Sequence, residues 1–384
     1  MEDMNEKKYI EDASIEGRRA EIAVKLKRVR DMMEREGLNA VLLRKHSNFS
    51  WITAGGKSYV TLYLEHGEAF VLITRDKQYI LTSVIEEPRM REEEQVEELG
   101  FEIVYQLWYE NRMSEMVREI AGDLTKVGCD TPFEGTRLMH EQINPLHFSL
   151  LENEVARYMH LGETLSRVLE EYIVTVKPGM TELEITGGLC NALWPHNIDQ
   201  VLFLVSADER AYRHRHGIPT EKVLEKHLNI SVNGRYKGLI TTVTRMAHFG
   251  KRDEKLVRQF DDTCEIECRC AAAIKVGTDD LGAYRVCKQA YEELGYASMW
   301  PLHGQGGAQS YNNRDYMVTE NSHRVTVPNQ GYCFNPVIDG TKAEDAFIAT
   351  ESGPLFITRP VSFPVVEKDC GGIHFRLPGL VFVD

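Results

Sequence analysis

The second half of the sequence carries a faint internal repeat, and this repeat constrains the fold more than any other feature. When the chain is laid on itself with a shift of 98 residues, IVTVKPGMTEL at 173–183 aligns with AAAIKVGTDDL at 271–281. In both copies a helical pattern ends at Lys-x-Gly, and Thr181 or Asp279 can then cap a second helix. The repeat therefore predicts two equivalent helix pairs.

Each predicted helix pair leads into strands that carry a two-residue turn signal. Asn233-Gly234 interrupts the first apolar run and Asp339-Gly340 interrupts the second. Both dipeptides favour the type I′ turn of a β-hairpin. Two duplicated helix-helix-hairpin units predict an α+β domain with pseudo-twofold symmetry and a cleft where its two curved sheets meet.

The length of 384 residues fits two domains preceded by a short tail. Residues 1–16 are polar and we expect them to be frayed. In residues 17–147, short apolar runs alternate with helical patterns, which predicts a smaller α/β domain with a mixed or parallel sheet. An acidic run at 91–98 is interpreted there as the solvated face of a helix. A long amphipathic helix follows, and we place the second domain at 148–384.

Composition and charge narrow the classes of function. The sequence has 45 Lys and Arg against 59 Asp and Glu, a formal charge of -14, which disfavours binding to nucleic acid or anionic membranes. Neither an apolar run long enough to cross a membrane nor a secretory signal is visible, so we expect a cytoplasmic protein. Eight cysteines are too few for a disulfide scaffold, and Cys264, Cys268 and Cys270 lie in an apolar helical stretch without the spacing of a metal site.

Four motifs occur in an order and spacing typical of one family. They are KPGMTELEI at 177–185, HGIPTEKVLEKH at 216–227, LHGQGG at 302–307 and EDAFIATESG at 344–353. With the repeat, they make the chain resemble the aminopeptidase P, prolidase and creatinase family. The resemblance implies a pita-bread catalytic domain behind a smaller N-terminal α/β domain. It also implies a homodimer, in which a lid from one chain, here 51–63, closes the cleft of the other.

The resemblance places most metal-binding positions on unsuitable residues. The family's peptidases hold two metal ions with two aspartates, a histidine and two glutamates, which fall here on Ser231, Thr242, His303, Asn335 and Glu344. Only His303 and Glu344 are retained. Hydroxyl and amide groups supply neither the charge nor the basicity that divalent cations require. We therefore expect no cofactor, and a standard two-metal peptidase site is disfavoured.

The metal-independent creatinase branch offers a second comparison. Its catalytic histidine matches His216, and its arginine that grips a substrate carboxylate matches Arg314. The two glutamates that hold the guanidinium group of creatine fall on Thr244 and Asn335, which cannot offset the desolvation of a cation. Creatine is thus disfavoured as a substrate.

A local basic cluster suggests a neutral or anionic ligand instead. RAYRHRH at 210–216 and Arg245 bring several arginines close to the expected cleft, and Arg213 and Arg245 are candidate substrate contacts. The alternative is that these arginines pair with carboxylates. In the catalytic interpretation, His216 is the general base, while His303 and Glu344 assist it.

Three functions are compatible with these residues. The leading hypothesis is a metal-independent, creatinase-like hydrolase or lyase that cleaves a carbon–nitrogen or similar bond in a small, carboxylate-bearing molecule. In that scheme Arg314, Asn335 and Thr244 bind the substrate. The alternatives are a catalytically degenerate module that binds a peptide or protein, and an Xaa-Pro peptidase with an altered metal site.

Overall fold

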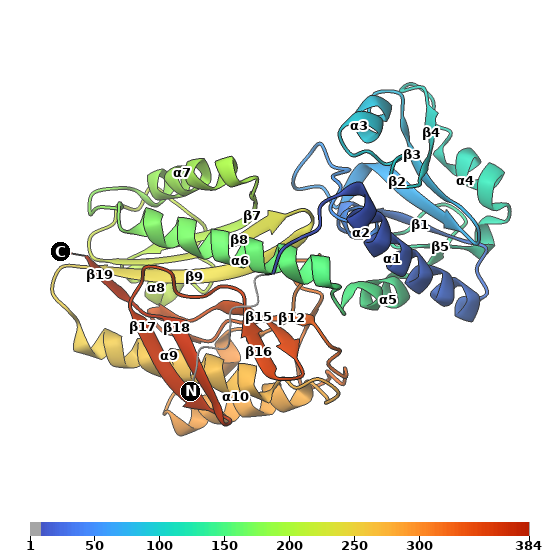
Figure 1. Cartoon of the computed structure of the whole chain (residues 1–384). Coiled ribbons are helices and arrows are strands. Elements are labelled where there is room, and N and C mark those ends of the chain that lie inside the picture. The colour runs from blue at the N-terminus through green and yellow to red at the C-terminus, as the bar shows by residue number, and fades with distance from the viewer. Residues whose placement is uncertain (1–8, 384) are drawn as a thin grey trace. The chain divides into compact units, whose positions relative to one another are not determined.

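The computed structural model describes residues 9–383, and their contacts divide the chain into two compact units (Figure 1). The N-terminal unit comprises residues 10–154 together with 237–239. The second unit, which we call the pita-bread unit, comprises residues 155–236 and 240–383 with Tyr9. The division falls in the first turn of helix α6 (Glu152–Ile173), shortly after the predicted boundary at 147/148.

A six-stranded mixed sheet forms the centre of the N-terminal unit, as the alternation of apolar runs predicted. Its strands lie in the order β4-β3-β2-β1-β5-β6, with β1 antiparallel to β2, β2 antiparallel to β3, and the other pairs parallel. The strands are β1 (Ala40–Lys45), β2 (His66–Thr74), β3 (Gln78–Ser83), β4 (Glu102–Gln106), β5 (Val127–Cys129) and β6 (Arg137–Leu138).

Helices cover this sheet, and the first of them begins within the segment predicted to be frayed. Helix α1 (Ile15–Glu36) starts after Ser14, whose hydroxyl accepts the N–H of Gly17, and it ends at Gly37 with φ 66°. Of the predicted tail, residues 1–8 lie outside the described part of the chain. The other helices are α2 (His46–Ile52), α3 (Glu87–Glu92), α4 (Met113–Ala121) and α5 (His140–Ile143).

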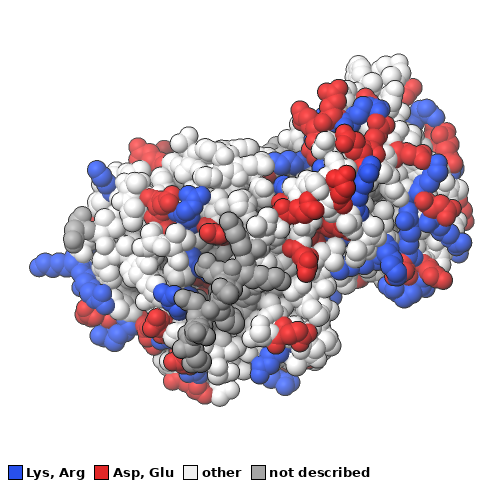
Figure 2. Space-filling model, in the orientation of Figure 1, with Lys and Arg blue, Asp and Glu red and all other residues white. Residues whose placement is uncertain are grey.

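The acidic run at 91–98 does not form one helical face. Helix α3 ends at Glu92, and Gln95 adopts φ 56°, a left-handed conformation that breaks the helix. Around α3, acidic and basic side chains alternate on the surface (Figure 2), where Arg89 pairs with Glu86. Within the run, Glu94 and Glu97 pair with Arg89 and Arg91, and Glu92, Glu93 and Glu98 are exposed.

Two sheets and two hairpins form the pita-bread unit. The first sheet has the order β19-β9-β8-β7 and the second β11-β10-β12-β15-β16. Their strands are β7 (Asp199–Ala207), β8 (His227–Tyr236), β9 (Leu239–Phe249), β19 (Val381–Val383), β10 (Gly306–Ala308), β11 (Tyr316–Met317), β12 (Gln330–Phe334), β15 (Asp345–Thr350) and β16 (Gly353–Phe356). The hairpins are β13 (Val337–Ile338) with β14 (Thr341–Lys342), and β17 (Val365–Cys370) with β18 (Ile373–Pro378).

Helices flank both sheets of this unit (Figure 1). Helices α6 and α7 (Glu182–Leu193) lie along the first sheet, and α9 (Glu254–Ala273) and α10 (Leu281–Glu293) pack on each other beside the second, while α8 (Glu209–Arg213) is short. Cys264, Cys268 and Cys270 are buried in α9 within the apolar core. Among residues 9–383, neither a group of three potential metal ligands nor a helix apolar and long enough to cross a membrane is found.

Equivalent backbone hydrogen bonds confirm the internal repeat. The N–H of Gly179 donates to Leu224 O, and the N–H of Gly277 donates to Thr326 O, both at 2.9 Å. Both glycines have positive φ after the first helix of each pair. The threonine at 181 completes a capping box on α7, and the carboxylate of Asp279 accepts the N–H of Leu281 at the start of α10.

One of the two predicted hairpin turns is misplaced. Asp339-Gly340 does join β13 to β14, but Asn233-Gly234 lies inside β8. The β8–β9 turn falls instead on Lys237-Gly238, whose φ values of 48° and 84° suit a type I′ turn. A Cβ on Gly234 would lie 2.8 Å from Ile198, so this glycine permits close packing against the sheet and does not form a turn.

Candidate functional site

Four polar side chains of the pita-bread unit form a closed, buried hydrogen-bonded ring. Ser231 on β8 and Thr244 on β9 face each other with 2.6 Å between their hydroxyl oxygens. The Thr244 hydroxyl donates to Oε2 of Glu344 at 2.7 Å, and Lys342 Nζ lies 2.6 Å from the same oxygen and 3.1 Å from Ser231 Oγ. The antiparallel hairpin β8–β9 and the end of β14 bring these residues together.

The protons of this ring have one arrangement. Because the carboxylate of Glu344 can only accept hydrogen bonds, the Thr244 hydroxyl donates its proton to Glu344. Ser231 must then donate to Thr244 and accept from Lys342. Burial opposes ionisation of Glu344, but the charge of Lys342 and the hydrogen bonds from Lys342 and Thr244 outweigh it and lower the pKa of Glu344.

The contact between Lys342 and Ser231 does not make a serine–lysine catalytic pair. A lysine activates a serine hydroxyl only as the free amine, whereas the ion pair with Glu344 favours the ammonium form. The Ser231 proton is also committed to Thr244. Lys342 therefore contributes a fixed positive charge to the site and one N–H beyond the two in the ring.

The residues at the family's metal-binding positions do not fit a pair of divalent ions. Of the five positions, Ser231 and Thr242 offer hydroxyls and Asn335 offers an amide, and the Thr242 hydroxyl accepts from Gln309 at 2.7 Å. Glu344 is neutralised by an ammonium group whose side chain is only 5% exposed. A divalent cation beside that buried ammonium would face repulsion with one histidine as its remaining good ligand.

His303 and His216 lie together at the edge of this ring. Their imidazole centroids are 5.6 Å apart in an edge-to-face arrangement, and His216 is exposed while His303 is partly buried. Burial, followed by the nearby charge of Lys342, lowers the pKa of His303 to about 4. His303 is therefore neutral at physiological pH, and His216 is the solvent-accessible imidazole of the pair.

Arg314 and Asn335 flank the site on the second sheet. Nη1 of Arg314 donates to the backbone oxygens of Gly307 and Cys333, at 3.2 and 2.9 Å. The charge of Arg314 also contributes to the lowered pKa of Glu344. Asn335 follows β12, where its N–H donates to Gln305 O at 3.0 Å.

Of the two arginines predicted to contact substrate, the structure excludes one, Arg245. Arg245 is buried, with Nε 2.9 Å from Glu170 and Nη1 3.0 Å from Asp345. Its guanidinium group therefore forms buried ion pairs between α6, β9 and β15. This corrects the expectation of a substrate contact, because a side chain 1% exposed and paired with two carboxylates is not available to a ligand. Arg213 is exposed at the end of α8.

The other arginines of the basic cluster are compensated as well. Nε of Arg210 lies 2.9 Å from Glu182, and Nη2 of Arg215 lies 2.7 Å from Asp339. The alternative interpretation of the basic cluster, pairing with carboxylates, therefore describes Arg210, Arg215 and Arg245. These three arginines therefore add no uncompensated positive charge to the site.

Lys342 is the residue of this buried ring that the sequence alone did not single out. It stands two residues before Glu344, and alternate residues of an extended segment point to one side, so the Lys-x-Glu spacing was a usable signal. The proximity of Lys342 to Ser231, more than 100 residues earlier in the chain, is visible only in the folded structure.

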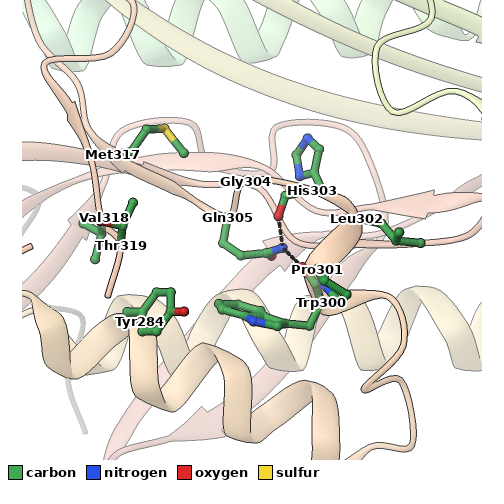
Figure 3. Close-up of a pocket in the computed structure, with 10 residues that line it drawn as sticks. All are labelled: Tyr284, Trp300, Pro301, Leu302, His303, Gly304, Gln305, Met317, Val318 and Thr319. Atoms are coloured by element: carbon green, nitrogen blue, oxygen red, sulfur yellow. Dashed lines mark hydrogen bonds between the residues drawn. The ribbon is translucent and has the colours of Figure 1, made fainter. Parts of the chain in front are cut away.

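A separate pocket of about 410 Å³ lies behind the segment that carries His303. Its walls include the aromatic rings of Tyr284 and Trp300, and the amide of Gln305 donates to His303 O at 2.7 Å (Figure 3). The imidazole of His303 points away from these two rings in the same view. None of the four residues of the hydrogen-bonded ring is among the residues that line this pocket.

Comparisons with known proteins agree with this architecture. The sequence profile of metallopeptidase family M24 matches residues 157–350, just over half of the chain, and that of the creatinase/prolidase N-terminal domain matches residues 25–155. An uncharacterized peptidase of Staphylococcus aureus is 20% identical over 217 residues, which cover 54% of this chain. The match spans only 61% of that relative.

Solved structures show the same fold at low identity. The Xaa-Pro dipeptidase from Bacillus anthracis superposes with a TM-score of 0.73 at 19% identity, covering 94% of this chain and 100% of the other. The N-terminal domain of the FACT complex subunit SPT16 from Cicer arietinum superposes with a TM-score of 0.68 at 12% identity, covering 89% and 97%. The profile matches and the pita-bread architecture together place this chain in metallopeptidase family M24, the aminopeptidase P, prolidase and creatinase family, with the family's creatinase/prolidase N-terminal domain.

Proposed function

We propose that this chain hydrolyses an amide-type carbon–nitrogen bond in a small, carboxylate-bearing substrate without a divalent metal ion. The observation that carries the proposal is the ion pair between Lys342 and Glu344, 2.6 Å apart among the former metal-ligand positions. It supplies positive charge where the family's peptidases use metal. Membership of M24 and the dipeptidase named among the similar structures support a peptide-like substrate.

In this proposal the exposed imidazole of His216 acts as the general base. It takes a proton from water, the resulting hydroxide attacks the carbonyl carbon, and the tetrahedral intermediate collapses with cleavage of the C–N bond. The proton held by His216 then passes to the departing nitrogen. Proton transfer of this kind contributes roughly 10²–10⁴-fold to a rate.

The remaining residues bind and orient the substrate in this scheme. In this proposal the N–H of Lys342 outside the ring and the amide of Asn335 stabilise the developing oxyanion. Arg314 supplies the positive charge for the substrate carboxylate. Neutral His303 orients His216 through their ring contact, and Glu344 holds Lys342 in place.

A second candidate function is a binding module without turnover. The observation that favours it is the closed ring itself, since Ser231, Thr244 and Glu344 satisfy one another and leave few groups free for chemistry. The similar fold of a FACT complex subunit is compatible with this alternative. An Xaa-Pro peptidase with an altered metal site is the third, and it is the alternative that the comparisons favour: the family model and the Xaa-Pro dipeptidase and X-Pro aminopeptidase among the similar structures support it.

One set of measurements separates the three. The full-length protein is analysed for bound metal, then assayed against Xaa-Pro dipeptides and a panel of small acyl amides and ureas, with EDTA or with added Mn²⁺. We expect turnover that EDTA leaves unchanged. Turnover that needs stoichiometric metal supports the altered peptidase instead, and ligand binding with no product supports the binding module.

A further inference from the structure

We infer that the site recognises an uncharged group bearing N–H donors, of the urea or primary carboxamide class, beside Asn335 and His303, and that it rejects guanidinium and ammonium groups. This deepens the proposed function, because it names the substrate class of the same site. It concerns binding only, so it stands or falls separately from turnover.

Two buried polar atoms at the site lack a hydrogen-bond partner. Within residues 9–383, Oδ1 of Asn335 and Nδ1 of His303 are both enclosed without a partner, and Asn335 is only 9% exposed. Such an orphaned group costs about 1–3 kcal/mol if nothing pairs with it. An amide or urea group can pair with both, because it offers N–H donors and a carbonyl acceptor.

The two residues also lie on adjacent backbone segments. Strands β10 and β12 are antiparallel with Gly306 opposite Phe334, and the N–H of Asn335 donates to Gln305 O at 3.0 Å. Asn335 therefore lies across from the segment that begins at His303. A planar group of a few atoms can span such neighbouring residues.

The charges around the site argue against a cation. The carboxylate of Glu344 is matched by Lys342 at 2.6 Å, and Asp339 is matched by Arg215 at 2.7 Å. The hydroxyl of Thr244 already donates its hydrogen bond to Glu344. A buried guanidinium beside these two carboxylates would find both of them already ion-paired, and the cost of its desolvation would not be recovered.

His303 supplies the second hydrogen-bond partner for such a ligand. Its Nδ1 is enclosed and has no hydrogen-bond partner among residues 9–383. An imidazole nitrogen without a proton accepts a ligand N–H, and one that carries a proton donates to a ligand carbonyl, so a urea or carboxamide group suits either tautomer.

Two isosteric probes test the inference on the full-length protein. Ureidoacetate and guanidinoacetate share the carboxylate and the planar head, and they differ in one non-hydrogen atom: a carbonyl oxygen stands in place of an NH₂⁺ group. Isothermal titration gives the affinity of each. We expect ureidoacetate to bind at least about tenfold more tightly to the wild type.

Asn335→Glu restores the carboxylate that suits a cation and should reverse the preference. Asn191→Glu adds the same charge on the exposed surface of α7 and should leave the preference unchanged. If Asn335→Glu does not fold, as judged by circular dichroism, Asn335→Leu replaces it. This second variant removes the acceptor and should abolish the preference for ureidoacetate.

Several outcomes overturn the inference. They are equal or tighter binding of guanidinoacetate to the wild type, no heat of binding for either probe at millimolar concentration, and a preference unaltered by the variants at Asn335. Binding of ureidoacetate without turnover of any related amide would refute the proposed hydrolysis and leave this inference intact.

Discussion

Lys342 Nζ lies 2.6 Å from Glu344 Oε2, and the two side chains are 5% and 3% exposed. Loss of one partner of a buried ion pair is destabilising, because the remaining charge is left unpaired in a medium of low dielectric constant. In a family whose peptidases place metal ions at this position, the pair provides a positive charge that is part of the chain. This relationship connects the folding of the site with its chemistry.

Removing the ammonium group should be strongly destabilising. Lys342→Met leaves the Glu344 carboxylate buried without its counter-ion, and we expect a loss of about 3–5 kcal/mol in the free energy of unfolding. The double variant Lys342→Met/Glu344→Gln removes both charges and should recover much of this loss. Chemical denaturation monitored by circular dichroism measures both.

An exposed ion pair provides the control for this prediction. Lys27 and Asp31 are 2.6 Å apart on the surface of α1, and Lys27→Met should cost less than about 1 kcal/mol. An equal loss in Lys342→Met and Lys27→Met would contradict the importance of the buried pair.

Divalent cations should not stabilise the wild-type protein. A bound ion raises the free energy of unfolding by RT ln(1 + [L]/Kd) and so raises the melting temperature, whereas an ion without a site leaves it unchanged. We expect no shift with millimolar Mn²⁺ or Zn²⁺ in a thermal-unfolding assay. The variant Ser231→Asp/Thr242→Asp/Asn335→Glu/Lys342→Ala restores the family's ligand set and should gain a metal-dependent increase. A clear metal-dependent shift in the wild type would refute the claim that the charge of Lys342 takes the place of the metal ions.

Acidification should destabilise the protein partly through His303. Its pKa of about 4 in the folded chain lies below the usual value of 6.5, so the unfolded chain binds more protons between these limits. The stability that His303 contributes is present above pH 6.5 and is lost as the pH falls toward 4, by up to about 3 kcal/mol. His303→Asn should flatten the dependence of unfolding free energy on pH in this window.

A histidine on the surface serves as the comparison for His303. His66 is exposed on β2, and His66→Asn should retain the wild-type pH dependence. Identical pH profiles for the wild type and His303→Asn would show that His303 is not held neutral by the fold.

Replacement of His216 should reduce turnover without affecting stability. Because the side chain is exposed, His216→Ala should change the free energy of unfolding by less than about 0.5 kcal/mol. If His216 is the general base, kcat should fall by roughly 10²–10⁴-fold. His214→Ala, also exposed and two residues away, is the matched control. Unchanged turnover in His216→Ala would remove His216 from the mechanism.

Gly306 should tolerate no side chain. It has φ 112°, and a Cβ there would lie 2.3 Å from Cys333 O on the neighbouring strand. We expect Gly306→Ala to lower the free energy of unfolding by more than about 2 kcal/mol. Gly282 on α10 has open space around its Cβ position, and Gly282→Ala should be neutral or stabilising by up to about 1 kcal/mol. Equal effects in the two variants, measured by chemical denaturation, would contradict the packing argument.

The sequence by itself determined the architecture of the pita-bread unit. The Lys-x-Gly signals at Gly179 and Gly277 are local, because a helix end requires particular backbone angles at one residue, and both adopt positive φ as expected. The turn signal at Asn233-Gly234 misled for the opposite reason. Turn propensity is weak, and the packing of Gly234 against Ile198 and Leu165 decided that the strand continues.

The sequence also identified most residues of the site, including the hydroxyls of Ser231 and Thr242 and the amide of Asn335 at positions where the family has metal ligands. What only the tertiary structure decided is how these groups combine. Lys342 reaches Ser231 across 111 positions of chain, and Arg245 turns to Glu170 and Asp345 instead of a ligand. Long side chains pair with whichever buried charge the fold brings within reach, and that proximity depends on how the strands and helices pack rather than on spacing along the chain.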